Sequence, residues 1–379
     1  TRNGTSFIDT VISNNEAQIA AAVEALAQGR ILYNLVLQLS AAEARQAFDA
    51  LSGEVHPSSA TVSQQQAVYV RNAVGARLRQ SVTAPGAQPL AYGAAAATAP
   101  LGAGLAPTLW AQGYGGWGNT SGNGNAAGVS NSIGGFLMGA DVAVAPNARA
   151  GLYAGFGQSQ FEAEARASVG SFDAYDIGAY AGTQLGNWAL RGGAGYSWHD
   201  VSVSRTVAFT NFSGGVEAGY TSGVAQAFGE VGYDMALGAV AFKPFAGLAY
   251  VCVGGVSFLE SGSVAALAVD APAMNTLYST LGVRAATSLQ MAGRTLTPSL
   301  TLGWQHAFGD TTPVATMLLT GGATPASVSG VPIAEDALLL EAGLSYGLSA
   351  TAALAVNYSG QLASSASQNA LTAQFSLRF

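Results

Sequence analysis

Residues Leu296–Phe308, which read LTPSLTLGWQHAF, decide the fold class because their apolar and polar side chains alternate. Even-numbered positions carry Leu, Pro, Leu, Leu, Trp, His and Phe, and odd-numbered positions carry Thr, Ser, Thr, Gly, Gln and Ala. Successive side chains of a β-strand point to opposite faces, so this period predicts a strand with one apolar face. The other face carries small, uncharged residues, which is typical of the lumen side of a membrane barrel.

The same period of two recurs throughout residues 109–379 and is clear in residues 148–158, 277–289 and 338–348. Turn residues divide this region into roughly twelve strands, an even number as in bacterial barrels. The strands are expected to begin near residues 110, 130, 148, 172, 187, 216, 240, 275, 295, 336, 351 and 369. Aromatic residues gather near the expected strand ends, as in interfacial girdles: Trp110, Trp117, Trp188, Trp198, Trp304, Tyr346, Tyr358 and Phe379. We therefore predict an all-β transmembrane barrel of twelve antiparallel strands.

The composition of the chain argues against an ordinary soluble domain and against a helical membrane protein. Charged residues make up 9% of the chain and hydrophobic residues 49%, whereas a typical soluble domain is about 25% charged. No stretch approaches the roughly 20 consecutive apolar residues of a membrane-spanning helix. The net charge of −7 and the lack of a basic cluster argue against nucleic-acid binding. One cysteine and three separated histidines predict neither a disulfide framework nor a metal site, and we expect no cofactor.

The first 108 residues have a different pattern. Apolar spacing predicts helices over residues 15–28, 40–51 and 59–80, the second opened by a capping box of Ser40 and Glu43. We divide the chain into a helical junction at 1–57, a helix at 58–80, a flexible linker rich in Ala, Gly and Pro at 81–108, and a barrel at 109–379. The helix at 58–80 has a length of roughly 30 Å, enough to thread a membrane-thick pore. A surface helix packed on its neighbours is the alternative.

Charged residues of the strand region are expected to face the lumen, because a lipid-facing charge costs roughly 2–4 kcal/mol at mid-membrane. The inward-facing set is Arg149, Asp176, Arg191, Glu230, Asp234, Arg284 and Glu341. These side chains can pair with one another. The helix at 58–80 also carries Arg71, Arg77 and Arg79, which splay around its axis at about 100° per residue. We predict that at least one of these arginines pairs with Glu230, Asp234 or Glu341.

Two sequence patterns match catalytic or nucleotide-binding motifs but lack the required context. Residues 113–118, GYGGWG, match G-x-G-x-x-G, yet a polar loop follows instead of a helix. Residues 343–347, GLSYG, match G-x-S-x-G, yet they lie inside an alternating strand. His199 and Asp200 are adjacent strand residues, so their side chains point to opposite faces. A barrel-embedded hydrolase stays open as an alternative.

Several segments, taken in order, resemble the C-terminal translocator domain of type V secretion autotransporters. Residues 50–56, ALSGEVH, resemble the segment ahead of the barrel, and residues 69–74, YVRNAV, with residues 77–79, RLR, resemble the linker helix. Residues 110–118, WAQGYGGWG, resemble the first strand. Later matches are residues 303–310, GWQHAFGD, residues 358–362, YSGQL, and residues 377–379, LRF, which resemble two late strands and the assembly signal. The resemblance covers residues 40–379.

This resemblance implies a barrel in the outer membrane of a Gram-negative bacterium, with a helix in its lumen. The domain would be a monomeric anchor and translocator that exports an N-terminal passenger to the cell surface. The barrel-assembly machinery would read the C-terminal residues Phe375, Leu377 and Phe379. Catalytic activity would belong to the passenger, and the barrel itself is not expected to be an enzyme.

Residues 1–39 would then be the last remnant of a passenger, with a signal peptide expected upstream of Thr1. The pair Asn14–Asn15 resembles the self-cleavage site of some family members, but the surrounding motif is missing, so this activity is not carried over. A simple diffusion porin is a further alternative. A porin has no use for a helical region and a linker before its first strand.

Overall fold

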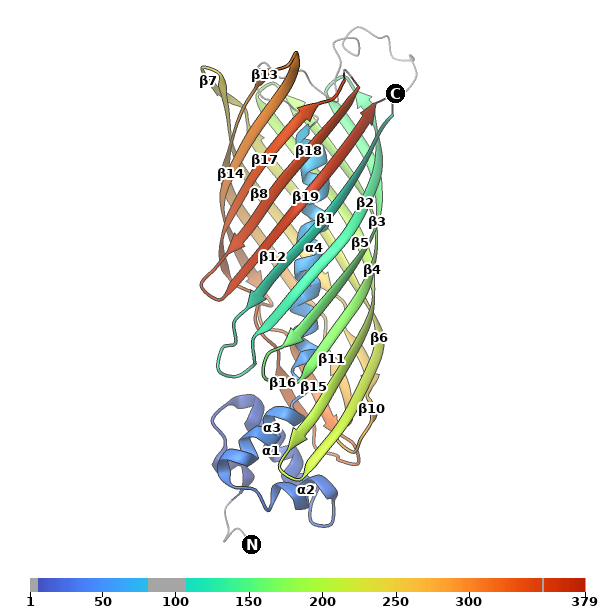
Figure 1. Ribbon diagram of the computed structural model, residues 1–379, viewed down its shortest axis with the longest axis vertical. Coiled ribbons are helices and arrows are strands. Elements are labelled where there is room, and N and C mark those ends of the chain that lie inside the picture. The colour runs from blue at the N-terminus through green and yellow to red at the C-terminus, as the bar shows by residue number, and fades with distance from the viewer. Residues whose placement is uncertain (1–5, 81–106, 350, 379) are drawn as a thin grey trace.

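The computed structural model describes residues 6–80, 107–349 and 351–378 (Figure 1). The helices in these ranges are η1 (Phe7–Thr10), α1 (Asn14–Ala25), α2 (Ile31–Val36), α3 (Ala41–Leu51) and α4 (Val55–Gln80). The long strands are β1 (Thr108–Thr120), β2 (Val129–Ala145), β3 (Ala148–Ala163), β4 (Ser168–Leu185), β5 (Trp188–Phe209), β6 (Phe212–Tyr233), β8 (Val240–Val253), β12 (Met274–Thr287), β14 (Arg294–Gly309), β17 (Asp336–Gly347), β18 (Ala352–Leu362) and β19 (Ala366–Arg378). The short strands are β7 (Met235–Leu237), β9 (Val256–Leu259), β10 (Ser261–Gly262), β11 (Leu267–Ala271), β13 (Leu289–Met291), β15 (Val314–Leu319) and β16 (Ala326–Ser329). Residues 81–106 of the expected linker lie outside the described residues.

The twelve long strands form one closed antiparallel barrel. Neighbours in the chain pair with each other, β6 pairs with β8, and β1 pairs with β19 along its whole length, from Thr108 opposite Arg378 to Thr120 opposite Ala366. Closure satisfies the backbone groups of both terminal strands, which a lipid environment requires. The predicted fold class is confirmed, and each long strand begins within four residues of its expected start.

The two faces of the barrel wall have opposite polarity. On β3, Leu152 faces outward and is 68% exposed, whereas Arg149 is buried in the lumen at 3% exposure. Large apolar side chains cover the outer face, and the exposed tryptophans among them are Trp117, Trp188, Trp198 and Trp304. Trp110 does not belong to the outer girdle, contrary to the prediction. It points into the lumen, where its indole nitrogen donates a hydrogen bond of 2.6 Å to the Tyr180 hydroxyl.

Strands β3 to β6 continue beyond the apolar band. β5 and β6 have 22 residues each, whereas about 9–11 residues of a tilted strand cross the hydrocarbon core. Past Tyr175 and Trp198 most outward side chains are polar, with Val169 an exception; the polar ones include Gln160, Glu162, Ser171, Ser202, Ser204 and Glu217. These strand ends project on the same side as α1, α2 and α3 (Figure 1). The longer connections lie on this side, which identifies it as the outer end, and the tight turns lie at the inner end.

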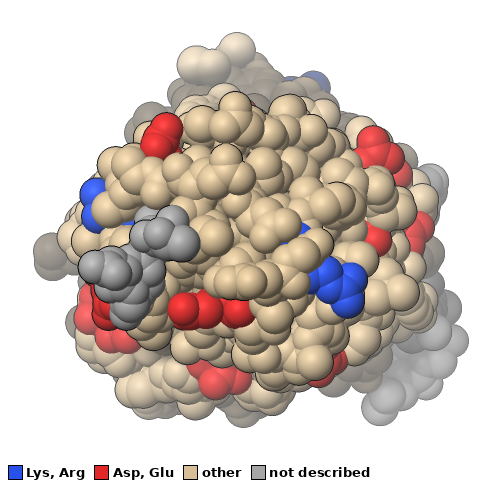
Figure 2. Space-filling view, turned by 90° about the horizontal axis from the view of Figure 1, so that it is seen from below, with Lys and Arg blue, Asp and Glu red and all other residues tan. Residues whose placement is uncertain are grey.

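The two longest connections, at 254–273 and 310–335, contain a second sheet that the sequence analysis missed. Its strands pair in the order β16, β15, β11, β9. The segments η1 and α1 to α3 pack on this sheet and on the ends of β5 and β6, around a core that includes Phe7, Phe48, Leu267 and Met317. We call residues 7–51 together with β9, β11, β15 and β16 the cap. Seen from this end, the surface is mostly uncharged, with scattered acidic groups and few basic ones (Figure 2).

The helix boundaries differ in part from the prediction. α4 begins at Val55 instead of residue 58, and Pro57 fits its first turn because N–H groups there have no helical acceptor. α3 has the predicted capping box, in which Ser40 and Glu43 bind each other's backbone N–H groups. α1 ends three residues early, and α2 has no counterpart in the prediction. Within the described residues, none of the helices combines the length and the hydropathy needed to cross a bilayer.

Candidate functional site

α4 runs through the lumen of the barrel from the cap toward the inner end (Figure 1). One side of it packs on the inner faces of β1 to β5. Val62, Val70, Val74 and Leu78 share a buried core there with aromatic and aliphatic side chains of the wall. The structure therefore places this helix inside the barrel, and not on the surface as in the alternative reading.

The polar side chains of α4 find partners on the lumen wall. The Gln66 amide donates a hydrogen bond of 2.7 Å to the Tyr114 hydroxyl. The Gln64 amide donates to the Thr276 hydroxyl at 3.2 Å, and its carbonyl accepts from the Tyr278 hydroxyl at 3.1 Å. Because buried polar groups are costly without partners, a helix rich in Gln, Ser and Arg is stable in a polar lumen and would be unstable in an apolar core.

Close approach between α4 and β1 depends on a glycine. The Tyr69 ring stacks on the Tyr114 ring, with a centroid distance of 5.8 Å and an interplanar angle of 13°. A Cβ atom at Gly116 would lie 2.6 Å from the Tyr69 hydroxyl, closer than any stable contact. Gly116 occupies a variable position of the G-x-G-x-x-G match at 113–118, and the whole match lies within strand β1.

Arg77 makes a buried ion pair that holds the inner part of α4 to the wall. Its Nε atom donates to Asp141 Oδ2 at 2.7 Å and its Nη2 atom to Oδ1 at 2.9 Å, and the two side chains are 1% and 2% exposed. The same carboxylate accepts hydrogen bonds from Arg149 and from the Tyr180 hydroxyl, the latter at 2.8 Å. One carboxylate of β2 therefore joins α4 to side chains of β3 and β4.

Asp141 is a partner of the helix that was not predicted. The signal for it lies in the alternation of β2, since Ile133 and Leu137 occupy the same odd-numbered, buried row. Extending that row by two steps of two residues reaches Asp141. Reading each strand for its complete inward row, instead of only for isolated charges, would have found this carboxylate.

The other two arginines of α4 face the opposite side of the lumen. Arg79 Nη2 lies 3.5 Å from Glu341 Oε2, with side-chain exposures of 25% and 24%. The Arg71 guanidinium lies over the Tyr278 ring, 5.6 Å from its centroid. Of the three candidate carboxylates, the structure brings Glu341 to a helix arginine, and Arg77 pairs with Asp141 instead.

The seven charges expected in the lumen lie along its inner surface or at its rim and contact one another or nearby polar groups. The partners are Asp141 for Arg149, Ser197 for Asp176, Glu230 for both Arg191 and Arg284, Lys243 for Asp234, and Arg79 for Glu341. Arg284 binds both oxygens of Glu230 at 2.7 Å, and Arg191 binds one at 2.9 Å. The lumen is therefore crossed by local charge networks.

Two of the three residues of the expected C-terminal assembly signal, Phe375 and Leu377, lie within the described residues. Phe375 and Leu371 face outward, with exposures of 43% and 50%, as lipid-facing residues of β19 do. Leu377 is partly buried on the same strand. Phe379 lies outside the described residues.

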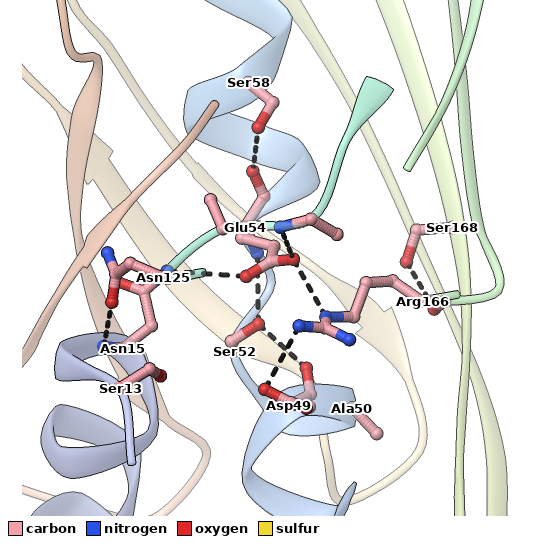
Figure 3. A network of polar contacts seen from close by, with 12 residues as sticks. Ser13, Asn15, Asp49, Ala50, Ser52, Glu54, Ser58, Asn125, Arg166 and Ser168 are labelled. Carbon is pink, nitrogen blue, oxygen red and sulfur yellow. Dashed lines mark hydrogen bonds and ion pairs between the residues drawn. The ribbon is translucent and has the colours of Figure 1, made fainter. Parts of the chain in front are cut away.

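A polar network joins α1, α3 and the start of α4 to the barrel at the outer end (Figure 3). Arg166, in the turn after β3, donates to Glu54 at 2.8 Å and lies 3.2 Å from Asp49. Asn15 exchanges hydrogen bonds with Asn125, at 2.7 and 3.1 Å. Burial raises the pKa of Asp49 to about 6, because it outweighs the attraction of Arg166. Because of its two hydrogen bonds to Asn125, Asn15 serves as a structural link between the cap and the barrel.

A second buried network centres on Glu260. The Glu260 carboxylate accepts two hydrogen bonds of 2.7 Å from Arg205 and lies 2.6 Å from His56 Nε2. Burial opposes the charge, but the hydrogen bonds from His56 and Arg205 prevail and lower the pKa of Glu260 to about 2. Burial lowers the pKa of His56. This network ties the start of α4 to β5 and to the cap.

His199 and Asp200 do not form a catalytic pair. His199 is fully buried in the lumen, where it stacks on Phe172 at a centroid distance of 4.4 Å and lies 3.2 Å from the Ser63 hydroxyl. Asp200 lies on the outer face and accepts a hydrogen bond of 3.0 Å from Thr221. The Ser63–His199 contact is enclosed between α4 and the wall, which leaves a substrate no room to reach it.

Comparisons with known proteins are consistent with a barrel threaded by a helix. The model of a family described as the autotransporter β-domain matches residues 109–359. Two extracellular serine proteases of Serratia marcescens are 32% identical over 368 residues and 30% identical over 367 residues, which cover 96% and 97% of this chain. The aligned parts make up 34% and 33% of those proteins, so the chain spans about a third of the length of these curated relatives.

Solved structures share the fold at low sequence identity. The translocator domain of the autotransporter NalP from Neisseria meningitidis has a TM-score of 0.60 at 14% identity, covering 83% of this chain and 98% of that one. The β domain of the Bordetella autotransporter BrkA has a TM-score of 0.56 at 18% identity, covering 72% and 100%. The transport unit of the autotransporter AIDA-I from Escherichia coli has a TM-score of 0.51 at 13% identity, covering 74% and 92%.

Proposed function

The chain belongs to the autotransporter β-domain family, and from this premise we propose that its lumen is the route by which an N-terminal passenger leaves the cell. The barrel is an outer-membrane translocator and anchor of a Gram-negative bacterium. The finer proposal concerns α4. We regard it as the part of the exported polypeptide that stays in the pore after the segment before it has reached the outside.

The path of the chain supports this proposal. α4 has its first residue, Val55, at the cap and its last residue, Gln80, toward the inner end (Figure 1). β1 starts at the inner end with Thr108, next to the end of β19. A polypeptide whose N-terminal part has reached the outside and whose C-terminal barrel is anchored in the membrane would lie in this direction.

The passenger that we propose is a secreted serine protease. The relatives that match nearly the whole chain are named extracellular serine proteases, and this chain aligns with a third of each. The family to which the barrel belongs is typically non-catalytic. We therefore assign catalysis to the passenger and none to the barrel.

We further propose that the barrel works as a monomer and that the barrel-assembly machinery inserts it. The outward side chains of β19, which include Leu371 and Phe375, form an apolar row. The assembly machinery can pair such a strand with a sheet edge before β19 closes the barrel by pairing with β1. A diffusion porin is the weaker candidate, because α4 occupies the lumen along the β1 to β5 wall.

Surface display tests the proposed function. A precursor that carries this chain at its C-terminus is expressed in a Gram-negative host, and its passenger is detected with an antibody on intact cells. The passenger should be exposed in the full precursor and absent from the surface when residues 109–379 are deleted. Insertion of the barrel in the outer membrane with the passenger retained in the periplasm would contradict the proposal.

A further inference from the structure

α4 leaves part of the lumen open. A cavity of about 130 Å³ lies between the helix and the wall formed by β6, β8, β12, β14, β17, β18 and β19, with Arg191 reaching it from β5. Its charged lining residues are four arginines and two glutamates: Arg71, Arg79, Arg191, Arg284, Glu230 and Glu341. The lining therefore has an excess of two positive charges.

The two glutamates do not satisfy these arginines. Arg191 and Arg284 share the carboxylate of Glu230, at 2.9 and 2.7 Å. The Nε atoms of both arginines are buried and have no hydrogen-bond acceptor in the described part of the chain. The side chain of Arg191 is only 5% exposed, so bulk water does not replace the missing acceptor.

Arg71 has even fewer partners. Its Nη1 atom is buried without an acceptor among residues 6–80, 107–349 and 351–378. Its guanidinium lies over the face of the Tyr278 ring, 5.6 Å from the centroid. Arg71 as a whole is partly exposed, but its buried Nη1 donor has no acceptor, which is costly, and an anion in the cavity would remove that cost.

We propose that this cavity is a binding site for a small inorganic oxyanion, such as sulfate or phosphate. Guanidinium groups present planar pairs of N–H donors that match the oxygens of such an anion. The cavity is several times larger than the roughly 30 Å³ that one water molecule takes up in the liquid, so a tetrahedral anion fits in place of water. The same excess of positive charge makes the space beside α4 favour anions over cations as permeating ions.

Calorimetric titration of the full chain in micelles of an uncharged detergent tests the site. Sodium sulfate and sodium phosphate are the two probes, and sodium chloride at equal ionic strength is the reference. We expect saturable binding of at least one oxyanion, weakened at least tenfold by Arg71→Met. The matched control is Arg294→Met, which removes an exposed arginine at a turn far from the cavity and should leave binding unchanged.

Saturable binding of sulfate, of phosphate or of both supports the proposal and identifies which oxyanion the site accepts. Absence of saturable binding with both, or equal binding by the wild type and the Arg71→Met variant, overturns it.

A measurement on the wild type alone gives a test that does not depend on the folding of a variant. In planar bilayers under a potassium chloride gradient, the reversal potential should show preference for chloride, and a value at zero or on the potassium side contradicts the proposal.

Discussion

The two sides of the lumen hold α4 in different ways. Toward β1 to β5, the helix meets aromatic rings, a glycine that lets the backbone approach, and the Arg77–Asp141 ion pair, whose side chains are 1% and 2% exposed. Toward β6 to β19 it meets the Arg79–Glu341 pair, whose side chains are 25% and 24% exposed, and a cavity that Arg191 of β5 also lines. Two arginines only two positions apart on one helix therefore experience different environments.

This difference separates two tasks. A buried, bidentate ion pair contributes strongly against the loss of one partner, whereas a partly solvated pair is screened and contributes little. We infer that the β1 to β5 wall seats the helix and that the opposite wall determines which ions pass beside it. The predictions below test this division, in order of decreasing expected effect.

The largest effect is expected from Asp141→Asn. The change keeps the shape of the side chain but leaves Arg77 and Arg149 without their shared counter-charge in a buried site. The free energy that seats α4 should fall by about 3–5 kcal/mol. Single-channel recording in planar bilayers should show a higher and noisier conductance than the wild type.

The control for this variant is Asp173→Asn, which removes a carboxylate from the exposed outer face of β4. Its conductance should match the wild type. A normal conductance for Asp141→Asn would show that the β1 to β5 wall does not seat the helix through this pair.

A smaller effect is expected from Gly116→Val. The added side chain meets the Tyr69 ring and must displace α4 from β1, at a cost of about 1–3 kcal/mol typical of overpacking. The matched control is Gly115→Val on the same strand, because a Cβ atom there meets nothing within 4 Å. Protease accessibility of α4 should rise for position 116 only, and an equal rise at both positions would contradict the packing argument.

Asp49→Asn tests whether the stability of the cap can change without a change in how α4 is held in the lumen. The pKa of Asp49 is raised to about 6, so its ionisation opposes the folded cap. Its contribution to stability is complete below about pH 4 and is lost as the pH rises through about 6. The Asn variant should stabilise the cap at pH 7 by about 1 kcal/mol, after allowance for partial exposure of the side chain.

Hydrogen exchange of α1 and α3 between pH 5 and pH 8 measures this effect. The wild-type cap should exchange faster, relative to the intrinsic rate, as the pH rises, and the variant should show a weaker dependence. Conductance should be the same for both proteins. A change in conductance would mean that the cap and the helix seat are coupled.

The smallest effect is expected from Arg79→Gln. The ion pair with Glu341 is about a quarter exposed on both sides, so its loss should cost no more than about 1 kcal/mol. Single-channel conductance should stay within twofold of the wild type. An increase as large as that of Asp141→Asn would reverse the roles that we assign to the two walls.

Much of the barrel could be predicted from the sequence, because a period of two is a strong signal over twelve long strands. The alternation also predicted that Arg191, Glu230 and Arg284 face inward, since a charge has one inexpensive side in a membrane barrel. The alternation within each strand does not predict which strand lies opposite a given face of α4. The Arg77–Asp141 pair joins residues 64 positions apart, and only closure of the barrel brings them together.

The cap was missed for a related reason. Its sheet consists of strands of four to six residues, too short for a period to emerge, and only the pairing of β11 with β15 joins the two long connections into one sheet. Its helices were partly predicted, since Ser40 and Glu43 form a local capping signal. Docking of these helices on the sheet depends on one shared core that includes both Phe48 and Met317, for which the local sequence carries no signal.

Backbone hydrogen exchange along α4 tests the central claim most directly. In the full chain, the amides of residues 70–80 are compared between the wild type, Arg77→Met and Arg79→Met. We predict that these amides exchange at least tenfold faster in Arg77→Met than in the wild type, which corresponds to a loss of at least about 1.4 kcal/mol of local stability. In Arg79→Met their exchange should stay within twofold of the wild type. Equal acceleration by both variants, or acceleration by Arg79→Met alone, would contradict the claim that the β1 to β5 wall seats the helix.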